Sequence, residues 1–124
     1  LRLTGSDGAI VHAEMRIGDS PIKLGEESAA WEAFGPKHFN GTPVTICLYV
    51  ADVDAQFRQA VDAGATVKRP LTDQFYGDRT GDLLDPYGHS WHLATRKENL
   101  TQEQMQRRME EWMRKQQQQM QAQA

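Results

Sequence analysis

The pattern of apolar and polar positions is clearest between residues 44 and 98. Residues 44–50 are β-branched and aromatic, which is typical of a strand. Apolar residues then recur with helical spacing, and Asp52 can cap this helix while Gly64 can end it. Three further stretches are typical of strands, namely residues 66–69, 79–84 and 89–95. We expect Pro70 to close the first of these three, and the predicted order is β-α-β-β-β.

The last of these strands carries the most informative pattern. It follows residues 85–88, Asp-Pro-Tyr-Gly, in which proline presets the first corner of a tight turn and glycine accepts a positive φ. Because side chains alternate along a strand, Ser90 and His92 should face one side of the sheet, with Trp91 and Leu93 on the other. A histidine on the open face of a sheet whose other face is apolar is a candidate for chemistry.

Before residue 44 the pattern is weaker. Residues 11–17 alternate and predict a strand with His12 and Glu14 on its polar side. A turn rich in glycine and proline leads to a second short strand at residues 22–24. Residues 28–43 have no clean period and are rich in small residues, so we interpret them as a connecting segment.

The composition changes after Glu98. Residues 99–115 predict an amphipathic helix, with Thr101 as its N-cap and Gln104 completing a capping box. Its apolar stripe consists of Met105, Met109, Trp112 and Met113. Residues 116–124 are a low-complexity run of glutamine and alanine, which we expect to be a frayed, solvated tail.

Composition and charge exclude several classes of protein. With 124 residues the chain suffices for one ordinary domain, and a net charge of −3 provides no basic face for nucleic acid. No stretch approaches the roughly 20 apolar residues of a membrane span. The single cysteine, Cys47, cannot form an internal disulfide and is typical of a reducing compartment. We therefore expect a cytoplasmic protein that binds neither nucleic acid nor membranes.

The β-α-β-β-β unit ending in residues 85–93, DPYGHSWHL, resembles one module of the vicinal oxygen chelate superfamily. That superfamily includes glyoxalases, bleomycin-resistance proteins, fosfomycin-resistance enzymes and extradiol dioxygenases. Residues 12–20 and 76–79 further resemble its PhnB-like branch. The resemblance implies an α+β fold in which βαβββ modules form a curved mixed sheet and a cup.

The resemblance covers residues 1–98, which we expect to form one glyoxalase/bleomycin-resistance-like domain. Residues 1–27 match only the last strands of a first module, residues 28–43 are the linker, and residues 44–98 are a complete second module. The opening strand and helix of the first module are missing, so we expect the chain to be a fragment of a longer product. Alternatively, a partner chain or the helix of residues 99–115 covers the exposed apolar face. Relatives often dimerise, so we expect a homodimer.

Metal-bearing members place His or Glu ligands at four positions inside the cup. Here one position falls in the missing strand, and another falls near Lys23 or Gly25, neither of which is a useful ligand. The third corresponds to Thr45, whose hydroxyl is a poor ligand for divalent Ni, Zn, Fe or Mn. The fourth corresponds to His92, which could still coordinate. This pattern argues against the usual metal site.

A displaced metal site built from His12, Glu14 and His92 is the alternative. It would support a lyase, isomerase or dioxygenase in which Glu14 or His92 moves a proton. His12 and Glu14 can instead form an ordinary cross-strand polar pair. Whether the chain is an enzyme stays open at this point.

The resemblance favours a metal-free protein that holds a small molecule in the cup, without a cofactor. The residues that we expect to contact this ligand are Thr45, Tyr49, Ser90, His92 and Arg79. A third hypothesis is a structural module whose cup is filled by its own side chains. The polar residues along the cup face favour a ligand over this third hypothesis.

Three of these positions also have ordinary structural interpretations. His92 can be a pocket histidine that is hydrogen-bonded to a neighbouring strand. Arg79 can hold the adjacent loop instead of contacting a ligand. Cys47 shares the face of Thr45 and could line the cup, although a small buried thiol is the state we expect.

Overall fold

The computed structural model describes residues 1–123, and they form a mixed α+β fold with two sheets and two α-helices. The chain divides into two compact units, Leu1–Gly41 and the part from Thr42 onward. The predicted fold class is therefore confirmed. The boundary between the units falls at the end of the segment that the sequence identified as a linker.

The first unit is a small antiparallel sheet with the strand order β1-β2-β3. Its strands are β1 (Arg2–Thr4), β2 (Ile10–Ile17) and β3 (Ser20–Leu24). Two short 3₁₀ turns follow, η1 (Ala29–Trp31) and η2 (Pro36–Phe39). This unit carries the predicted candidates His12 and Glu14, both on β2.

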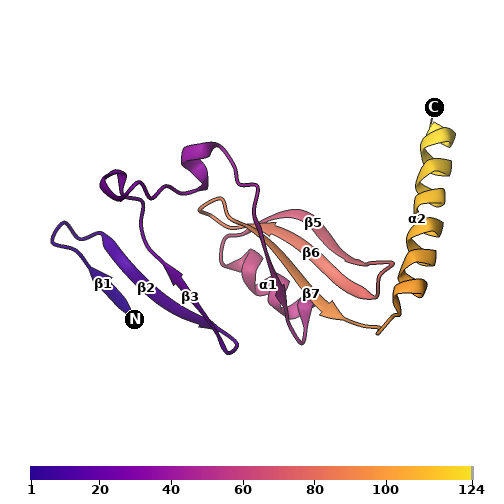
Figure 1. The fold of residues 1–124 in the computed structure, drawn as a ribbon, viewed down its shortest axis with the longest axis horizontal. Helices are drawn as coiled ribbons and strands as arrows, with labels where there is room; N and C mark the ends of the chain where they lie inside the picture. The colour runs from indigo at the N-terminus through magenta and orange to yellow at the C-terminus, as the bar shows by residue number, and fades with distance from the viewer. Residues whose placement is uncertain (124) are drawn as a thin grey trace. The chain divides into compact units, whose positions relative to one another are not determined.

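The second unit contains the complete β-α-β-β-β order that the sequence predicted (Figure 1). Its elements are β4 (Thr45–Tyr49), α1 (Val53–Asp62), β5 (Thr66–Asp73), β6 (Asp78–Leu84), β7 (Ser90–Arg96) and α2 (Gln102–Gln123). The four strands form one sheet in the order β4-β7-β6-β5. The pair β4 and β7 is parallel, and the other two pairs are antiparallel.

The predicted end of β5 at Arg69 is wrong, because the strand continues through Pro70 to Asp73. Proline cannot donate a ladder hydrogen bond, so a strand tolerates it at an edge or at a bulge. Both conditions hold here. β5 is the last strand of the sheet, and its register with β6 shifts between Arg69 and Thr72.

Helix α1 covers one face of the sheet and supplies much of its apolar core. Val53 and Phe57 pack there with Leu83 of β6 and Leu93 of β7. Phe57 approaches β6 so closely that a Cβ on Gly81 would lie 2.5 Å from its ring. A residue without a side chain is therefore required on β6 beneath this ring.

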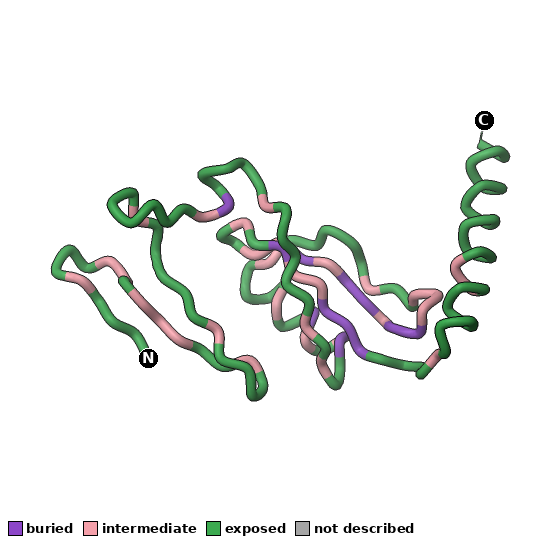
Figure 2. The backbone as a smooth tube through the Cα atoms, viewed as in Figure 1, coloured by how far each residue is buried: buried purple, intermediate pink, exposed green. Residues whose placement is uncertain are grey.

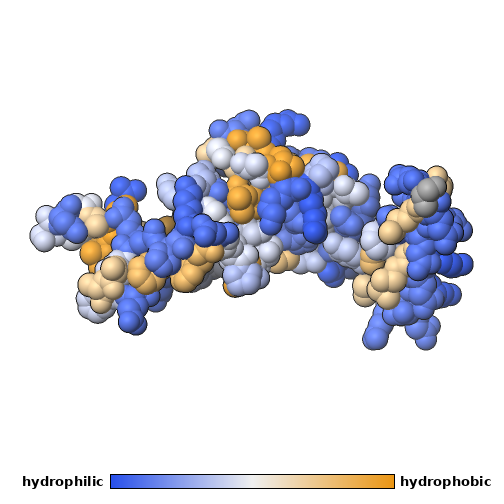
Figure 3. Space-filling view, turned by 90° about the horizontal axis from the view of Figure 1, so that it is seen from above, coloured by the Kyte–Doolittle hydropathy of each residue, from blue (hydrophilic) through white to orange (hydrophobic). Residues whose placement is uncertain are grey.

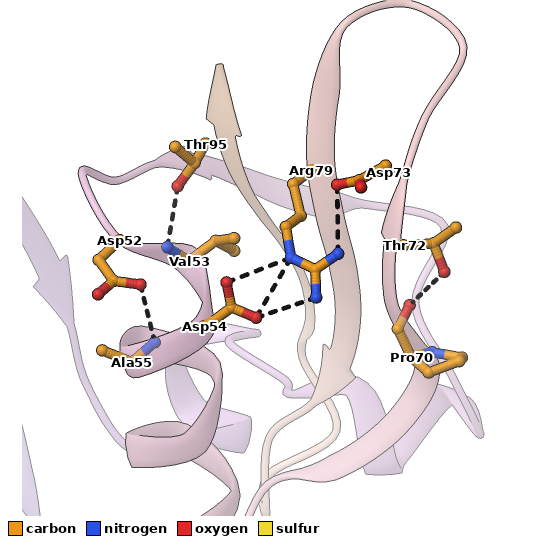
Figure 4. Close-up of polar contacts among 9 residues, drawn as sticks. All are labelled: Asp52, Val53, Asp54, Ala55, Pro70, Thr72, Asp73, Arg79 and Thr95. Atoms are coloured by element: carbon orange, nitrogen blue, oxygen red, sulfur yellow. Dashed lines mark hydrogen bonds and ion pairs between the residues drawn. The ribbon is translucent and has the colours of Figure 1, made fainter. Parts of the chain in front are cut away.

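The start of α1 is fixed by polar contacts that Figure 4 shows. The Asp52 carboxylate accepts a hydrogen bond from the Ala55 amide at 3.2 Å, which confirms the predicted cap. The Val53 amide donates to the Thr95 hydroxyl at 2.9 Å. That hydroxyl also donates to the Val50 carbonyl at 2.8 Å. These bonds join the helix start to β7 and align the helix over the sheet.

Burial within the second unit is concentrated in β6 and β7, the two central strands (Figure 2). Their apolar side chains face α1, as Leu83 and Leu93 do. Alternate positions face the other way and include three buried polar residues, Asp78, Thr80 and Ser90. The sheet therefore has one apolar face against α1 and one polar face.

Helix α2 begins with the predicted capping box. The Thr101 amide donates to the Gln104 side chain at 2.9 Å, and the Gln104 amide donates to the Thr101 hydroxyl at 3.2 Å. The helix continues to Gln123, whereas we expected it to end at residue 115 and the following residues to fray. Ala124, the last residue of that tail, lies outside the described residues.

The apolar stripe of α2 is only partly covered. The Trp112 ring packs on Phe75 with a centroid distance of 5.6 Å, while Met113 stays 51% exposed. Figure 3 shows this helix as mostly hydrophilic with pale orange atoms along part of it. Among the described residues, no helix is both long enough and apolar enough to cross a membrane.

Replacing Gly81 with alanine should destabilise the second unit by about 1–3 kcal/mol, because the new methyl group would overlap the Phe57 ring. Urea titration followed by circular dichroism measures this change. Gly35→Ala is the control, since its Cβ would meet nothing nearer than 3.7 Å. Equal stability of the Gly81 variant and the control would contradict this account of the core.

Thr101→Ala should raise hydrogen exchange at the Gln104 amide about fivefold, the equivalent of losing about 1 kcal/mol of capping energy. Thr101→Ser retains the hydroxyl and should exchange as the natural chain does. Exchange that is equally fast in all three proteins would show that the capping box contributes nothing to the start of α2.

Candidate functional site

The polar face of the second-unit sheet gathers most of the predicted ligand contacts. Leu48 of β4 packs on the α1 side, so its neighbours Cys47 and Tyr49 face away from the helix. In the same way, Leu93 places His92 on the polar face. The predicted residues that share this face are Thr45, Tyr49, Ser90 and His92. We call it the polar face below.

His92 is held at the centre of the polar face by a carboxylate on the neighbouring strand. Its Nδ1 lies 2.5 Å from Oδ1 of Asp82, and the two residues are partners in the ladder of β6 and β7. The other Asp82 oxygen lies 3.5 Å from the Arg69 guanidinium of β5. The prediction of a histidine hydrogen-bonded to a neighbouring strand is therefore confirmed. Asp82 was missed by sequence reasoning.

A second polar cluster joins Tyr49, Asp78 and Arg96. The Tyr49 hydroxyl donates to Oδ2 of Asp78 at 2.6 Å, and Nε of Arg96 donates to Oδ1 at 3.3 Å. The guanidinium of Arg96 lies 5.4 Å from the centre of the Tyr49 ring. The hydrogen bond to Asp78 raises the pKa of Tyr49, because it favours the protonated phenol. The phenol is thus a hydrogen-bond donor fixed at this end of β4.

A third cluster joins the hydroxyl groups of Thr45 and Ser90. The Thr45 hydroxyl donates to Oγ of Ser90 at 3.2 Å, and Nζ of Lys68 donates to the same oxygen at 3.4 Å. Thr45 and Ser90 are partners in the parallel ladder of β4 and β7. These contacts place a positive charge from β5 beside Ser90, the partner of Thr45, and Thr45 is the position at which the resemblance implies a metal ligand.

Tyr76 lies close to these clusters from the loop between β5 and β6. Burial raises its pKa, and the charges of Asp78 and Asp82 raise it further. These groups therefore lie within electrostatic reach of its hydroxyl. The period-two spacing of Asp78, Thr80 and Asp82 was the signal that could have assigned them to the polar face.

Arg79, the fifth predicted ligand contact, does not lie with the other four. It shares the α1 face with Gly81, and its guanidinium lies 3.1 Å from Asp54 of α1 and 3.2 Å from Asp73 of β5 (Figure 4). The hydrogen bonds between Asp54 and Arg79 favour the charged form of both groups. They lower the pKa of Asp54 and raise the pKa of Arg79. Arg79 thus holds the hairpin and the helix start together, as its structural interpretation predicted.

A pocket of about 600 Å³ adjoins the Arg79 ion pairs. Its lining residues are Asp54, Asp73, Gln74, Gly77, Asp78, Arg79, Lys97, Glu98 and Arg108. Carboxylates and cations are mixed in this lining, and Arg79 and Arg108 are both paired with carboxylates. The pocket therefore does not select for one sign of ligand charge.

The candidates for a displaced metal site belong to different units. His12 Nε2 lies 3.2 Å from Oε1 of Glu14, so these two pair along one strand and not across two strands. His92 belongs to the second unit, where it is bound to Asp82. Within residues 1–123, no group of three or more His, Cys, Asp or Glu side chains is arranged to hold a metal ion.

The donors around Thr45 also do not fit a divalent metal. Its hydroxyl is neutral and bonded to Ser90, and the ammonium group of Lys68 shares that partner. A cation beside a metal position repels the metal, and a neutral hydroxyl is a weak ligand for it. No step of the proposed function therefore uses a metal.

Cys47 is exposed, so the expectation of a small buried thiol is wrong. It lies on β4, and its side chain faces away from α1, the helix that covers the other face of the sheet. It neighbours His92 in the parallel ladder. The sequence could place Cys47 on the face of Thr45, but it could not show that the face is open there.

Proteins of two mycobacteria are similar to this chain. The uncharacterized proteins from Mycobacterium bovis and Mycobacterium tuberculosis are each 44% identical to it over 96 residues, which is 75% of this chain. The match spans 63% of the length of the first relative and 56% of the second. This chain thus corresponds to a part of those proteins.

Two solved structures have the same architecture. TioX from Micromonospora sp. ML1 has a TM-score of 0.59 and 28% identity, covering 77% of this chain and 76% of its own. A Pseudomonas aeruginosa protein has a TM-score of 0.59 and 20% identity, covering 73% of this chain and 66% of its own. The second comparison shows the fold alone.

A family model agrees with this architecture and matches residues 3–93. Most of the described strands and helix α1 lie within the match. The chain therefore belongs to the Glyoxalase/Bleomycin resistance protein/Dioxygenase superfamily.

Proposed function

We propose that this chain is a small-molecule-binding protein of the superfamily, and that its ligand lies on the polar face without the usual metal centre. The observation that supports this most directly is the set of side chains already ordered on that face. The Asp82–His92 pair, the Tyr49–Asp78 pair and the Thr45–Ser90 pair are each hydrogen-bonded.

This order favours binding because the side chains are fixed before a ligand arrives. Association otherwise costs about 0.5–1.5 kcal/mol for each flexible side chain that becomes immobilised. Here Asp78 and Asp82, both on the central strand β6, hold their partners Tyr49 and His92. The unused hydrogen-bonding groups of His92 and Thr45 then recognise polar atoms of a ligand.

The face also offers a flat surface for stacking. Tyr49 is 53% exposed although its hydroxyl is fixed by Asp78, so its ring is oriented and accessible. An aromatic ring held in this way stacks on planar ligands with little loss of freedom. The ligand class that fits these groups is a polar organic molecule with a planar portion.

A purely structural role is less consistent with the residues on this face. A cup filled by its own side chains would be lined with leucine or isoleucine. The corresponding positions here are Thr45, Cys47, Ser90 and His92. Thr45, Ser90 and His92 are each hydrogen-bonded to another side chain, so these polar groups are ordered.

We also propose three features of its biology. The chain belongs to the PhnB-like branch, on the motifs around residues 12–20 and 76–79. It acts in the cytoplasm, because its one cysteine is a free thiol. It forms a homodimer, because Trp112 and Met113 of the α2 stripe stay 44% and 51% exposed.

His92→Ala should weaken the binding of a ligand identified by thermal-shift screening about 5- to 30-fold, the equivalent of one hydrogen bond of about 1–2 kcal/mol. Isothermal titration calorimetry measures the change. His89→Ala is the matched control, since His89 is exposed in the preceding turn. Unchanged affinity of the His92 variant for each ligand found would remove His92 from the site.

Dialysis against a chelator should leave ligand affinity unchanged, because the donors around Thr45 do not fit a divalent metal. Elemental analysis of protein purified without chelators or a histidine tag should find no stoichiometric Ni, Zn, Fe or Mn. A stoichiometric metal whose removal abolishes binding would favour the metal-dependent lyase, isomerase or dioxygenase instead.

A further inference from the structure

The charge that a ligand meets on the polar face is mainly positive. The strands carry two carboxylates there, Asp78 and Asp82, whose side chains are only 2% and 16% exposed. Their cationic partners are far more accessible, since the side chain of Arg96 is 58% exposed and that of Arg69 is 83% exposed. Lys68 adds a third cation. The accessible charge of this face is thus opposite in sign to that of the whole chain, whose net charge is −3.

Lys68 differs from the two arginines in the group that it contacts. Arg69 and Arg96 each form an ion pair with a carboxylate of β6. The ammonium of Lys68 instead donates to the neutral oxygen of Ser90 at 3.4 Å, and none of the ion pairs formed within residues 1–123 includes it. An ammonium group has three donor protons, so two of them remain for a ligand. Lys68 therefore keeps an unbalanced charge and free hydrogen-bond donors on this face.

The contact with Ser90 fixes where this charge lies. Ser90 is 4% exposed, and its oxygen also accepts a hydrogen bond from Thr45 at 3.2 Å. Ser90 is the first residue of β7, so the strand continues the polar face in one direction only, toward His92. These two residues are two positions apart, which is about 7 Å along a strand. A ring attached to an anion at Lys68 therefore extends over His92.

We propose that Lys68 is the anion-binding residue of the polar face and that the ligand held there is an aromatic carboxylate. The carboxylate accepts hydrogen bonds from the free donors of Lys68, and the aromatic ring lies over His92. This inference rests on the proposed function and deepens it, because it adds the sign of the ligand's charge and the residue that recognises that charge.

One unbalanced cation suits a ligand with one negative charge. The charges of Arg69 and Arg96 are already balanced by their carboxylates, so a dianion such as a phosphate monoester would have one charge without a partner. A hydrogen bond between an ammonium and a carboxylate is roughly twice as strong as one between neutral groups. The exposed arginines further attract an approaching anion through their longer-range field. A carboxylate therefore fits this face better than a neutral group or a dianion.

A matched pair of probes tests the sign of the ligand's charge. 2-Naphthoate and 2-naphthamide share one planar ring system and differ in the charge of the attached group. Each is titrated into the full chain at neutral pH and low salt, and the backbone amides are followed by NMR. We expect 2-naphthoate to bind about tenfold more tightly than 2-naphthamide, with the largest shifts at residues 90–92.

Lys68→Met should remove this preference, because it deletes the charge and keeps an unbranched side chain. 2-Naphthoate should then bind about as weakly as 2-naphthamide. Lys68→Arg retains the charge and should bind 2-naphthoate within about threefold of the natural chain. Lys23→Met is the matched control, since Lys23 is an exposed lysine on β3 of the first unit and its loss changes the net charge equally. Circular dichroism confirms that each variant is folded.

The chain's only cysteine, Cys47, reports the local charge without any bound ligand. It is exposed and lies two residues from Thr45, about 7 Å along the same face of β4. Iodoacetate and iodoacetamide both react with the thiolate, so the ratio of their rates does not depend on how much thiolate is present. A nearby cation favours the anionic reagent. At low salt Lys68→Met should lower the ratio of iodoacetate to iodoacetamide rates about twofold, and Lys23→Met should leave it unchanged.

Equal affinities for 2-naphthamide and 2-naphthoate would overturn this proposal, as would a folded Lys68→Met variant whose affinity for 2-naphthoate is unchanged. An unchanged rate ratio in Lys68→Met would overturn it as well, whether or not a probe binds. Failure of the proposed function has a different signature. In that case neither probe shifts the amides of the polar face in a saturable way, although the rate ratio still falls in Lys68→Met. The aromatic carboxylate would then be excluded as a ligand.

Discussion

The close packing of α1 on β6 is the constraint on which the second unit depends. The Phe57 ring occupies the space above Gly81, and any side chain there would collide with it. This contact fixes which positions of β6 face the helix. Because side chains alternate along a strand, Asp78, Thr80 and Asp82 must then face the opposite side. The polar face is thus a direct consequence of how the apolar face packs.

The same alternation separates two kinds of charged group on one strand. Arg79 is directed to the α1 side, where Asp54 and Asp73 bind it, and it serves to hold the hairpin in place. Asp78 and Asp82 are directed to the polar face and orient Tyr49 and His92. A buried carboxylate is tolerated only when it is paired or hydrogen-bonded. The pairing that makes Asp78 tolerable is therefore the same pairing that orders the proposed site.

The side chains around Thr45 and His92 do not suit a divalent metal, and their hydrogen bonds give the reason. Asp82 engages one ring nitrogen of His92 on the closing strand, and Thr45 carries a neutral hydroxyl whose partner Ser90 is also bonded to Lys68. The face consequently presents ordered hydrogen-bonding groups. The superfamily's architecture is preserved, while the chemistry available to the site is set by a few side chains on it.

The sequence by itself determined those features that depend on near neighbours in the chain. The capping box of Thr101, the cap at Asp52 and the faces of β7 follow from spacing alone, and each is present in the structure. Only the tertiary structure decided the continuation of β5 through Pro70, the Asp82–His92 pair and the exposure of Cys47. These depend on which strand lies beside which and in what register. Strand order joins residues that are far apart in the chain, so no local pattern encodes it.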